Sequence, residues 1–243
     1  MPITVTPLSD ACGAEISGAD LREPLDAATV RAIEEAFHQH VVVVFRGQDL
    51  TEEDQRRFAT AFGDGEMWFH HDTSYYEKPH KATLLYSMTL PSRGGNTCFA
   101  NMYKAYENVP ADLKKKLDGR KVLQLHDYKR RERIDIYNTD ISGMLRHEQP
   151  IFVTHPATGR KALYISRLMS ARIEGLAPDE NEAILEQLFD ISEDPSIVFE
   201  HEWKLGDLVM WDNYASIHMR RDFPRDEPRL MRRLTLEGYG PLS

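Results

Sequence analysis

Three residues in this sequence have the types and the spacing of a metal site. His70 and Asp72 lie two positions apart in the segment Phe69–Tyr75, and His218 follows much later in the chain. Residues i and i+2 of an extended strand project to the same face, so a strand here would point His70 and Asp72 together and His71 away. Two imidazoles and one carboxylate leave one side of a metal open, which suits non-haem Fe(II).

The His-x-Asp triplet is weak support when it is considered alone. With 10 His and 39 acidic residues in 243 positions, about 1.6 His-x-Asp/Glu triplets are expected by chance, and the sequence contains one. A polar strand end with a solvated carboxylate is therefore the alternative interpretation of His70 and Asp72. Other motifs have to decide between the two.

Composition bounds the classes of protein that this chain can be. A length of 243 residues with 41% hydrophobic content predicts one domain over residues 1–243 with a substantial core. The net charge of −9 argues against nucleic acid and anionic membranes as partners. The two cysteines, Cys12 and Cys98, form no disulfide framework or zinc-type spacing, and Met1–Val5 does not begin a signal peptide, so we expect a cytoplasmic protein. The longest apolar run, Val41–Phe45, is too short to span a bilayer.

The elements that position these residues are mainly short strands with flanking helices. Apolar periodicity and capping residues predict helices over Leu25–Gln39, Thr51–Gly63, Met102–Asn108, Ala111–Leu117 and Asp179–Leu188. Alternating and continuous apolar runs predict strands over residues 3–7, Val41–Phe45, the His70 segment, Lys81–Leu90, Thr97–Ala100, Ile151–Thr154, Ala162–Ser166, Ser196–Trp203, Asp207–Trp211, Ser216–Arg220 and Leu230–Leu236. Many short strands separated by turns predict a sandwich or barrel. The charged segment Lys129–Met144 is either a solvated surface loop or a lid over a site.

The last predicted strand carries an unusual set of arginines. Arg229, Arg233 and Thr235 fall on one face of it, while Leu234 and Leu236 fall on the other. By pattern alone the leucine face is core and the arginine face is solvated. If the arginine face instead lines a cavity, its guanidinium groups need anionic partners, and arginine binds carboxylate or sulfonate with two parallel hydrogen bonds.

Taken together, these motifs resemble the taurine dioxygenase and 2,4-dichlorophenoxyacetate dioxygenase family of Fe(II)/2-oxoglutarate oxygenases. The resemblance runs along most of the chain, and its motifs keep the family's order and spacing. They are Phe69–Tyr75, Arg93–Thr97, Gly206–Asn213 with His218, and Arg229–Arg233.

The resemblance implies a fold and a set of roles for individual residues. The family fold is a double-stranded β-helix, a jelly roll in which two sheets enclose the metal. Two groups bind cofactors in this scheme: the iron ligands His70, Asp72 and His218, and the pair Thr97 and Arg229, which binds the distal carboxylate of 2-oxoglutarate. Two residues are the implied substrate contacts: Arg233, for the anionic group, and Tyr75, which lies close to the ligands in sequence.

The activity that the resemblance implies is hydroxylation of an unactivated C–H bond with dioxygen, giving succinate and CO2. Arg233 indicates a small anionic organic substrate: a sulfonate, a carboxylate or an aryloxyalkanoate. Family members commonly associate, so a homo-oligomer is an implied partner. Two alternatives stay open, a non-catalytic jelly-roll sensor of metal and 2-oxoglutarate and a zinc hydrolase; the hydrolase has no use for Thr97, Arg229 and Arg233.

The sequence departs from the family in two places. The segment between Gly63 and His70 is short, whereas relatives usually have a longer insertion there that contributes substrate contacts. The residue between the two ligands is His71, where a small polar residue is common. Because of the short segment, we expect a substrate pocket that is more open, or one shaped by Lys129–Met144. We expect His71 to point away from the iron.

Overall fold

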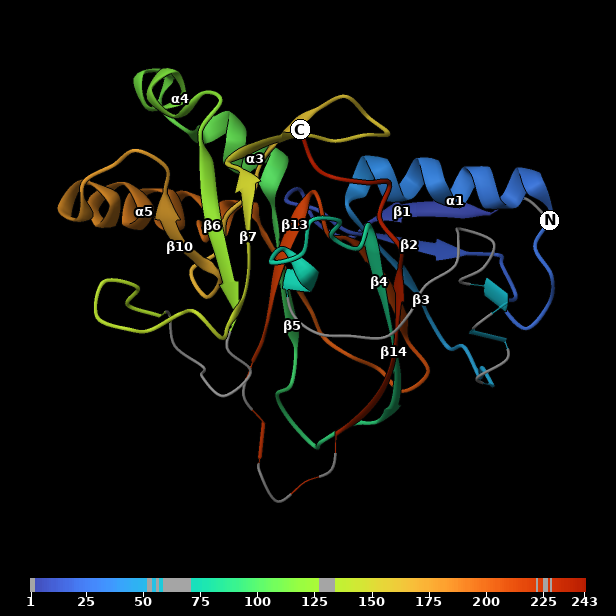
Figure 1. Cartoon of the computed structure of the whole chain (residues 1–243). Helices are drawn as coiled ribbons and strands as arrows, with labels where there is room; N and C mark the ends of the chain where they lie inside the picture. The colour runs from blue at the N-terminus through green and yellow to red at the C-terminus, as the bar shows by residue number, and fades with distance from the viewer. Residues whose placement is uncertain are drawn as a thin grey trace.

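The computed structural model describes residues 3–51, 54, 55, 57, 58, 71–126, 134–221, 223, 224, 227 and 229–243. Strands dominate these residues (Figure 1). The strands are β1 Thr4–Pro7, β2 Ala14–Ser17, β3 Val42–Phe45, β4 Ala82–Thr89, β5 Thr97–Asn101, β6 Lys121–His126, β7 Leu145–Pro150, β8 Phe152–Thr154, β9 Lys161–Leu163, β10 Ser170–Ile173, β11 Val198–His201, β12 Leu208–Asp212, β13 Ser216–Arg220 and β14 Leu230–Leu236. The helical elements are α1 Ala27–His40, α3 Met102–Asn108, α4 Ala111–Leu117, α5 Pro178–Ser192 and the short 3-10 turns His71–Thr73 and Pro195–Ile197.

A six-stranded sheet, the major sheet, forms one wall of the fold in the order β1-β2-β3-β12-β4-β14. Strands β3 and β12 pair antiparallel in its middle, with Val42 opposite Trp211 and Val44 opposite Val209. These side chains belong to one buried cluster, whereas Val43 and Phe45 belong to another. The prediction that the Val41–Phe45 run is buried on both faces is therefore confirmed.

Helix α1 covers the outer face of the major sheet (Figure 1). Asp26 caps its start, because the carboxylate accepts hydrogen bonds from the backbone N–H groups of Ala28 and Thr29. The stripe residues Ile33 and Phe37 are buried in the cluster that contains Val43 and Phe45. The predicted cap and the predicted apolar face are thus both confirmed.

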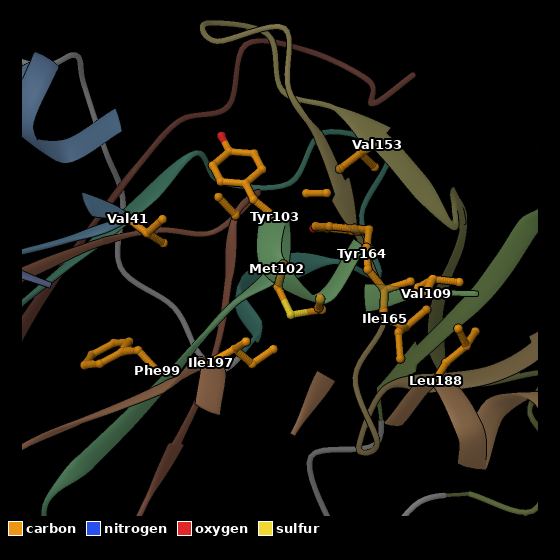
Figure 2. Close-up of a cluster of buried hydrophobic side chains, with 14 of the residues drawn as sticks. Val41, Phe99, Met102, Tyr103, Val109, Val153, Tyr164, Ile165, Leu188 and Ile197 are labelled. Carbon is orange, nitrogen blue, oxygen red and sulfur yellow. The ribbon is translucent and has the colours of Figure 1, made fainter. Parts of the chain in front are cut away.

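A three-stranded sheet, β11-β5-β13, faces the major sheet, and its strands are antiparallel. The core between the two sheets contains Phe99 of β5 and Val209 and Trp211 of β12, and it continues into helices α3 and α5. Figure 2 shows Phe99, Met102 and Tyr164 among the labelled side chains of this cluster. Two apolar sheets packed face to face are the predicted jelly roll.

Several predicted boundaries coincide with the observed ones and others are wrong. Helices α3 and α4 and strands β13 and β14 begin and end where they were predicted. Four strands were not predicted, namely β2, β6, β7 and β10. Of the predicted helix Thr51–Gly63, the structure describes a capping box at its start, where Thr51 and Asp54 exchange side chain–backbone hydrogen bonds. The remainder of that helix is largely outside the described residues.

The described part of the Lys129–Met144 segment contains no helix or strand. It is attached to the fold by Ile134, which is buried against Leu125 and Ala171. Within the described residues, no helix combines the length and the apolar character needed to cross a membrane.

Candidate active site

The segment around Asp72 forms a tight turn, so the prediction of an extended strand is wrong for its described part. Residues His71–Thr73 make a 3-10 turn, with Asp72 at φ −53° and ψ 103° and Thr73 at the positive φ of 71°. Thr73 closes the turn, because its carbonyl accepts from the N–H of Tyr76 at 2.8 Å and its hydroxyl accepts from the N–H of His80 at 2.8 Å. Local hydrogen bonds of this kind compete with strand pairing. His70 and the side chain of His71 lie outside the described residues, so the strand argument for their directions is untested.

The turn delivers the Asp72 carboxylate into the space between the sheets. Asp72 is fully buried, and its Oδ2 accepts a hydrogen bond of 2.6 Å from the hydroxyl of Thr83. Its Oδ1 accepts from Nη2 of Arg233. Burial raises the pKa of Asp72, but the charges of His218 and Arg233 and the hydrogen bonds from Thr83 and Arg233 outweigh it and hold the pKa below its ordinary value. The carboxylate is therefore ionised near neutral pH, as a metal ligand must be.

His218 reaches the same space from the opposite sheet. On β13 it lies opposite Phe99 of β5, and partners in an antiparallel pair project to the same face. Its ring centre is 4.8 Å from that of Trp211 in the major sheet and 6.2 Å from that of Phe99. Together with its influence on the pKa of Asp72, these contacts bring two of the three predicted ligands together.

The register of the major sheet explains why Arg233 and Thr83 meet Asp72. Leu85 of β4 lies opposite Arg233 of β14, and Thr83 lies opposite Thr235 on the same face. Of the two interpretations of the last strand, the structure therefore supports an arginine face directed inward. The Arg233 side chain is 13% exposed. On the other face, Leu236 belongs to the core cluster of Val43 and Phe45 and Leu234 packs against it, so the predicted leucine face is confirmed and both faces of β14 are covered.

Arg229 is a half-buried cation that lies near two aromatic rings. Its guanidinium carbon is 5.9 Å from the ring centres of Trp203 and Phe223. Among the residues that the structure describes, its buried Nε has no hydrogen-bond partner. Burial and the neighbouring Arg220 lower the pKa of Arg229 to about 10, so the group is still charged at neutral pH. Gly95 leaves room for it: φ there is +72°, and a Cβ would lie 3.0 Å from the Arg229 Nε.

Thr97 is held by Trp203, the residue that also lies beside Arg229. The indole Nε1 of Trp203 donates to the Thr97 hydroxyl oxygen at 2.9 Å, and both side chains are buried. Sequence reasoning did not single out Trp203. The signal that could have found it is weak, since an indole N–H buried in a core generally needs an acceptor, but the sequence does not say which one.

Tyr75, the second predicted substrate contact, is a core residue in this structure. Its side chain is 2% exposed, and its ring stacks on His126 at 4.9 Å and meets Tyr76 edge-on at 4.8 Å. Gln149 of β7 fixes the backbone on both sides of it, because the amide donates to the carbonyls of Ser74 and Tyr76 at 3.0 and 2.6 Å. Tyr75 thus supports the turn that carries Asp72, and its contact with a substrate stays a prediction.

The residues that could hold a metal are Asp72 and His218, with His70 predicted as the third. The described residues contain no group of three His, Cys, Asp or Glu side chains arranged for a metal, and His70 is not among them. A buried ionised carboxylate facing an imidazole suits a divalent cation. Arginines that are largely withdrawn from solvent, as Arg233 is, suit anions. The enclosed polar site between two sheets places this chain in the class of jelly-roll oxygenases.

Comparison with known families agrees with that class. Residues 4–69 and 64–235 match the family model described as "Taurine catabolism dioxygenase TauD, TfdA family", and the chain belongs to this family. The predicted fold, the dioxygenase activity and the dependence on 2-oxoglutarate and a non-haem iron are thereby confirmed.

Three similar proteins illustrate the range of this family. The alpha-ketoglutarate-dependent 2,4-dichlorophenoxyacetate dioxygenase of Cupriavidus pinatubonensis is 30% identical, over 97% of this chain and 98% of the relative. The alpha-ketoglutarate-dependent sulfate ester dioxygenase of Pseudomonas putida is 29% identical, over 100% of this chain and 92% of the relative. A crystal structure of AAD-2 in complex with Mn(II) and N-oxalylglycine superposes with a TM-score of 0.89 at 31% identity and covers 100% of both chains.

The relatives carry residues that this chain lacks. The alignment with the Cupriavidus protein spans 285 positions, at least 42 more than the 243 residues of this chain. The family match also falls into two pieces that meet at residues 64–69. This is the segment that the sequence analysis found to be short, and it lies outside the described residues.

Proposed function

We propose that the chain hydroxylates a small anionic organic molecule at a site made of the metal ligands His70, Asp72 and His218. Thr97 and Arg229 bind the distal carboxylate of 2-oxoglutarate, and Arg233 meets the anionic group of the substrate. The observation that carries the proposal is Arg229, a half-buried guanidinium whose Nε is inaccessible to solvent and has no partner among the described residues. The distal carboxylate of 2-oxoglutarate would satisfy it.

The surroundings of Arg229 favour a carboxylate over water as that partner. The rings of Trp203 and Phe223 lie near the guanidinium and limit its contact with solvent, which strengthens an ion pair there. Because the indole of Trp203 is a donor without acceptor capacity, the Thr97 oxygen accepts from it, and the Thr97 proton is left to donate elsewhere. A guanidinium and a hydroxyl proton together match the two oxygens of one carboxylate.

The roles of the remaining residues follow from their placement. Iron and 2-oxoglutarate, when bound, supply the oxidising chemistry that inserts oxygen into a C–H bond and releases succinate and CO2. Asp72, from its turn beside the major sheet, and His218, from β13 of the facing sheet, would hold the metal, and the aromatic rings of Trp211 and Phe99 beside His218 keep that side dry. Arg233 has five N–H donors, so it can bind Asp72 and an incoming anion at the same time.

The substrate class rests on Arg233 and on the relatives. Relatives are described as acting on 2,4-dichlorophenoxyacetate and on sulfate esters, and each of these substrates carries one anionic group. We propose an aryloxyalkanoate, sulfonate or sulfate ester here. If the hydroxylated carbon bears an ether or ester oxygen, the product collapses to a carbonyl compound and the leaving anion.

The short segment before His70 leaves the pocket more open than in relatives. A single domain, a cytoplasmic location and a homo-oligomer complete the proposal.

The test is an anaerobic optical titration of the metal-free protein with Fe(II) and 2-oxoglutarate. We expect a weak charge-transfer band in the green. In Arg229→Ala the 2-oxoglutarate concentration needed for half of the band should rise about 10- to 100-fold, since a charge-assisted hydrogen bond contributes about 1.5–3 kcal/mol. Arg221→Ala is the matched control, because that side chain is 55% exposed and pairs with Glu200. An unchanged titration of Arg229→Ala would remove the assignment of Arg229.

The same band reports the substrate class. Phenoxyacetate added to the loaded protein should shift the band, and phenoxyacetamide, which has the same shape and no charge, should not. Equal shifts by both compounds would contradict an anion site at Arg233.

A further inference from the structure

A buried chain of hydrogen bonds ends on the Asp72 carboxylate. The side-chain amide of Asn213 donates from Nδ2 to the hydroxyl oxygen of Thr83 at 3.1 Å, and Thr83 donates its proton to Asp72 Oδ2 at 2.6 Å. All three side chains are almost completely buried. Water therefore does not compete for these hydrogen bonds.

The direction of the hydrogen bonds in this chain is set at its first member. An amide NH2 is a donor, so it occupies the Thr83 oxygen as an acceptor. The single hydroxyl proton of Thr83 is then directed to Asp72. Thr97, on the facing sheet, has the same arrangement. The Trp203 indole N–H occupies its oxygen as an acceptor, and the Thr97 hydroxyl proton is left to bind an anion.

Both members are fixed by the major sheet. Thr83 lies on β4 between Trp211 of β12 and Thr235 of β14. Asn213 follows β12 directly, and its backbone N–H donates to the carbonyl of Lys81 at 2.9 Å. This bond fixes the backbone from which the Asn213 amide reaches Thr83.

We propose that Thr83 and Asn213 are positioning residues that set the rotation of the Asp72 carboxylate for metal binding. The inference rests on the proposed role of Asp72 as a ligand. Arginine prefers to take both oxygens of a carboxylate in a two-bond pair. Arg233 already donates to Oδ1, and the bond from Thr83 holds Oδ2 away from it. Without that bond the carboxylate rotates toward Arg233, and the metal loses an oxygen to a competing cation.

The test is Mn(II) affinity, measured from the electron paramagnetic resonance signal of the free ion in the presence of 2-oxoglutarate. Thr83→Val keeps the shape and removes the proton, and it should weaken Mn(II) binding about 10- to 100-fold, as is typical when a hydrogen-bond partner of a metal ligand is lost. Thr83→Ser keeps the proton and should stay within about threefold of wild type. Circular dichroism on each variant confirms that the fold is retained.

Asn213→Asp tests the direction of the chain in a second, independent way. A carboxylate at this position accepts the Thr83 proton, so Asp72 loses its donor, and we expect a loss of Mn(II) affinity similar to that of Thr83→Val. The added negative charge alone would strengthen cation binding, so a loss identifies the reversed hydrogen bond. Unchanged or tighter binding in Asn213→Asp would contradict the proposal.

Thr235→Val is the matched control. Thr235 lies opposite Thr83, is equally buried, and its hydroxyl has no hydrogen-bond partner within the described part of the chain. It should bind Mn(II) like the wild type. Wild-type affinity in Thr83→Val, or an equal loss in Thr235→Val, would overturn the positioning role.

Asp72→Ala separates this proposal from the one it rests on. If Asp72→Ala abolishes Mn(II) binding while Thr83→Val leaves it intact, the ligand assignment stands and the positioning role fails. If Asp72→Ala binds Mn(II) like the wild type, the ligand assignment fails, and the positioning role fails with it.

Discussion

At the scale of single residues, two threonine hydroxyls of the site each accept a hydrogen bond from a neighbouring N–H group, which leaves the hydroxyl proton available to a carboxylate. Trp203 connects two proposed 2-oxoglutarate contacts, because its indole N–H holds Thr97 while its ring lies beside Arg229. Removing the indole N–H leaves Thr97 free to rotate and to give its proton to another acceptor. The affinity for 2-oxoglutarate should then fall without a change in the metal ligands.

We predict that Trp203→Phe raises the KM for 2-oxoglutarate about fivefold, the effect of a hydrogen bond contributing about 1 kcal/mol. Substrate-dependent succinate formation at saturating 2-oxoglutarate should change less than KM does. The measurement is steady-state kinetics with varied 2-oxoglutarate.

A double-mutant cycle shows whether the effect acts through Thr97. Thr97→Val removes the same hydrogen bond from the other side, so the double variant should be little worse than Thr97→Val alone. Additive losses would mean that Trp203 acts independently of Thr97, through packing against Arg229.

At the scale of elements, the turn that begins β12 is fixed by one buried carboxylate. Asp207 Oδ2 accepts from Arg46 Nη1 at 2.5 Å, from the backbone N–H of Lys204 at 2.9 Å and from His201 Nε2 at 3.1 Å. The turn Lys204–Asp207 also makes four hydrogen bonds with Ser87 of β4. It therefore sets the start of the strand whose far end carries Asn213.

We predict that Asp207→Ala lowers the free energy of unfolding by about 3 kcal/mol, because it leaves Arg46 and two other donors without their buried acceptor. Urea unfolding followed by circular dichroism measures it. Glu15→Ala is the control, since Glu15 is 3.7 Å from Arg46 and its side chain is 37% exposed, and it should cost less than about 1 kcal/mol. Equal costs would show that Arg46 gains as much from the half-exposed pair with Glu15 as from the buried one with Asp207.

Local sequence predicted those strands whose own apolar pattern identifies them, whichever strand they pair with. The alternation in Ser216–Arg220 and Leu230–Leu236 predicts both strands with correct ends. In contrast, β7 is polar and largely exposed, and it is a strand because it pairs with β6 along its whole length. The sequence of one segment does not predict which distant strand it will pair with.

The site shows the same contrast between residues that the sequence identifies and the hydrogen-bond partners that it does not. The resemblance gave Asp72, His218, Thr97 and Arg229, but not the residues that hold them. The partner of Thr97 lies 106 positions away and the amide donor to Thr83 lies 130 positions away. Neither Trp203 nor the Asn213–Thr83 contact has a local signature. The strand predicted around Asp72 failed because the hydroxyl and carbonyl of Thr73 close a turn there.

At the scale of the whole molecule, burial of weak acids sets how the fold responds to alkali. Burial raises the pKa of the Cys12 thiol to about 12, and it raises the pKa values of the Tyr103, Tyr164 and Tyr214 phenols above their ordinary value. In the unfolded chain these groups ionise near pH 8.5–10. The folded chain keeps their protons at that pH, so the unfolded state binds fewer protons and stability falls as pH rises.

We predict that the free energy of unfolding is steady near neutral pH and declines from about pH 9 upward. Tyr103→Phe isolates one contributor, since its hydroxyl bonds Thr158 at 3.1 Å inside the fold. At pH 7 this variant loses that hydrogen bond and is less stable than the wild type by about 1 kcal/mol. A phenylalanine has no proton to lose, so its decline with pH is shallower, and the two curves should converge between about pH 9 and 11.

Urea unfolding of both proteins at a series of pH values measures this convergence. Tyr137→Phe is the control, because Tyr137 is 43% exposed whereas Tyr103 is buried. Its stability curve should therefore run parallel to the wild type at all pH values. A Tyr103→Phe curve that also stays parallel would show that the folded chain gives up the Tyr103 proton as readily as the unfolded one, and the alkaline decline would have to come from the other buried acids.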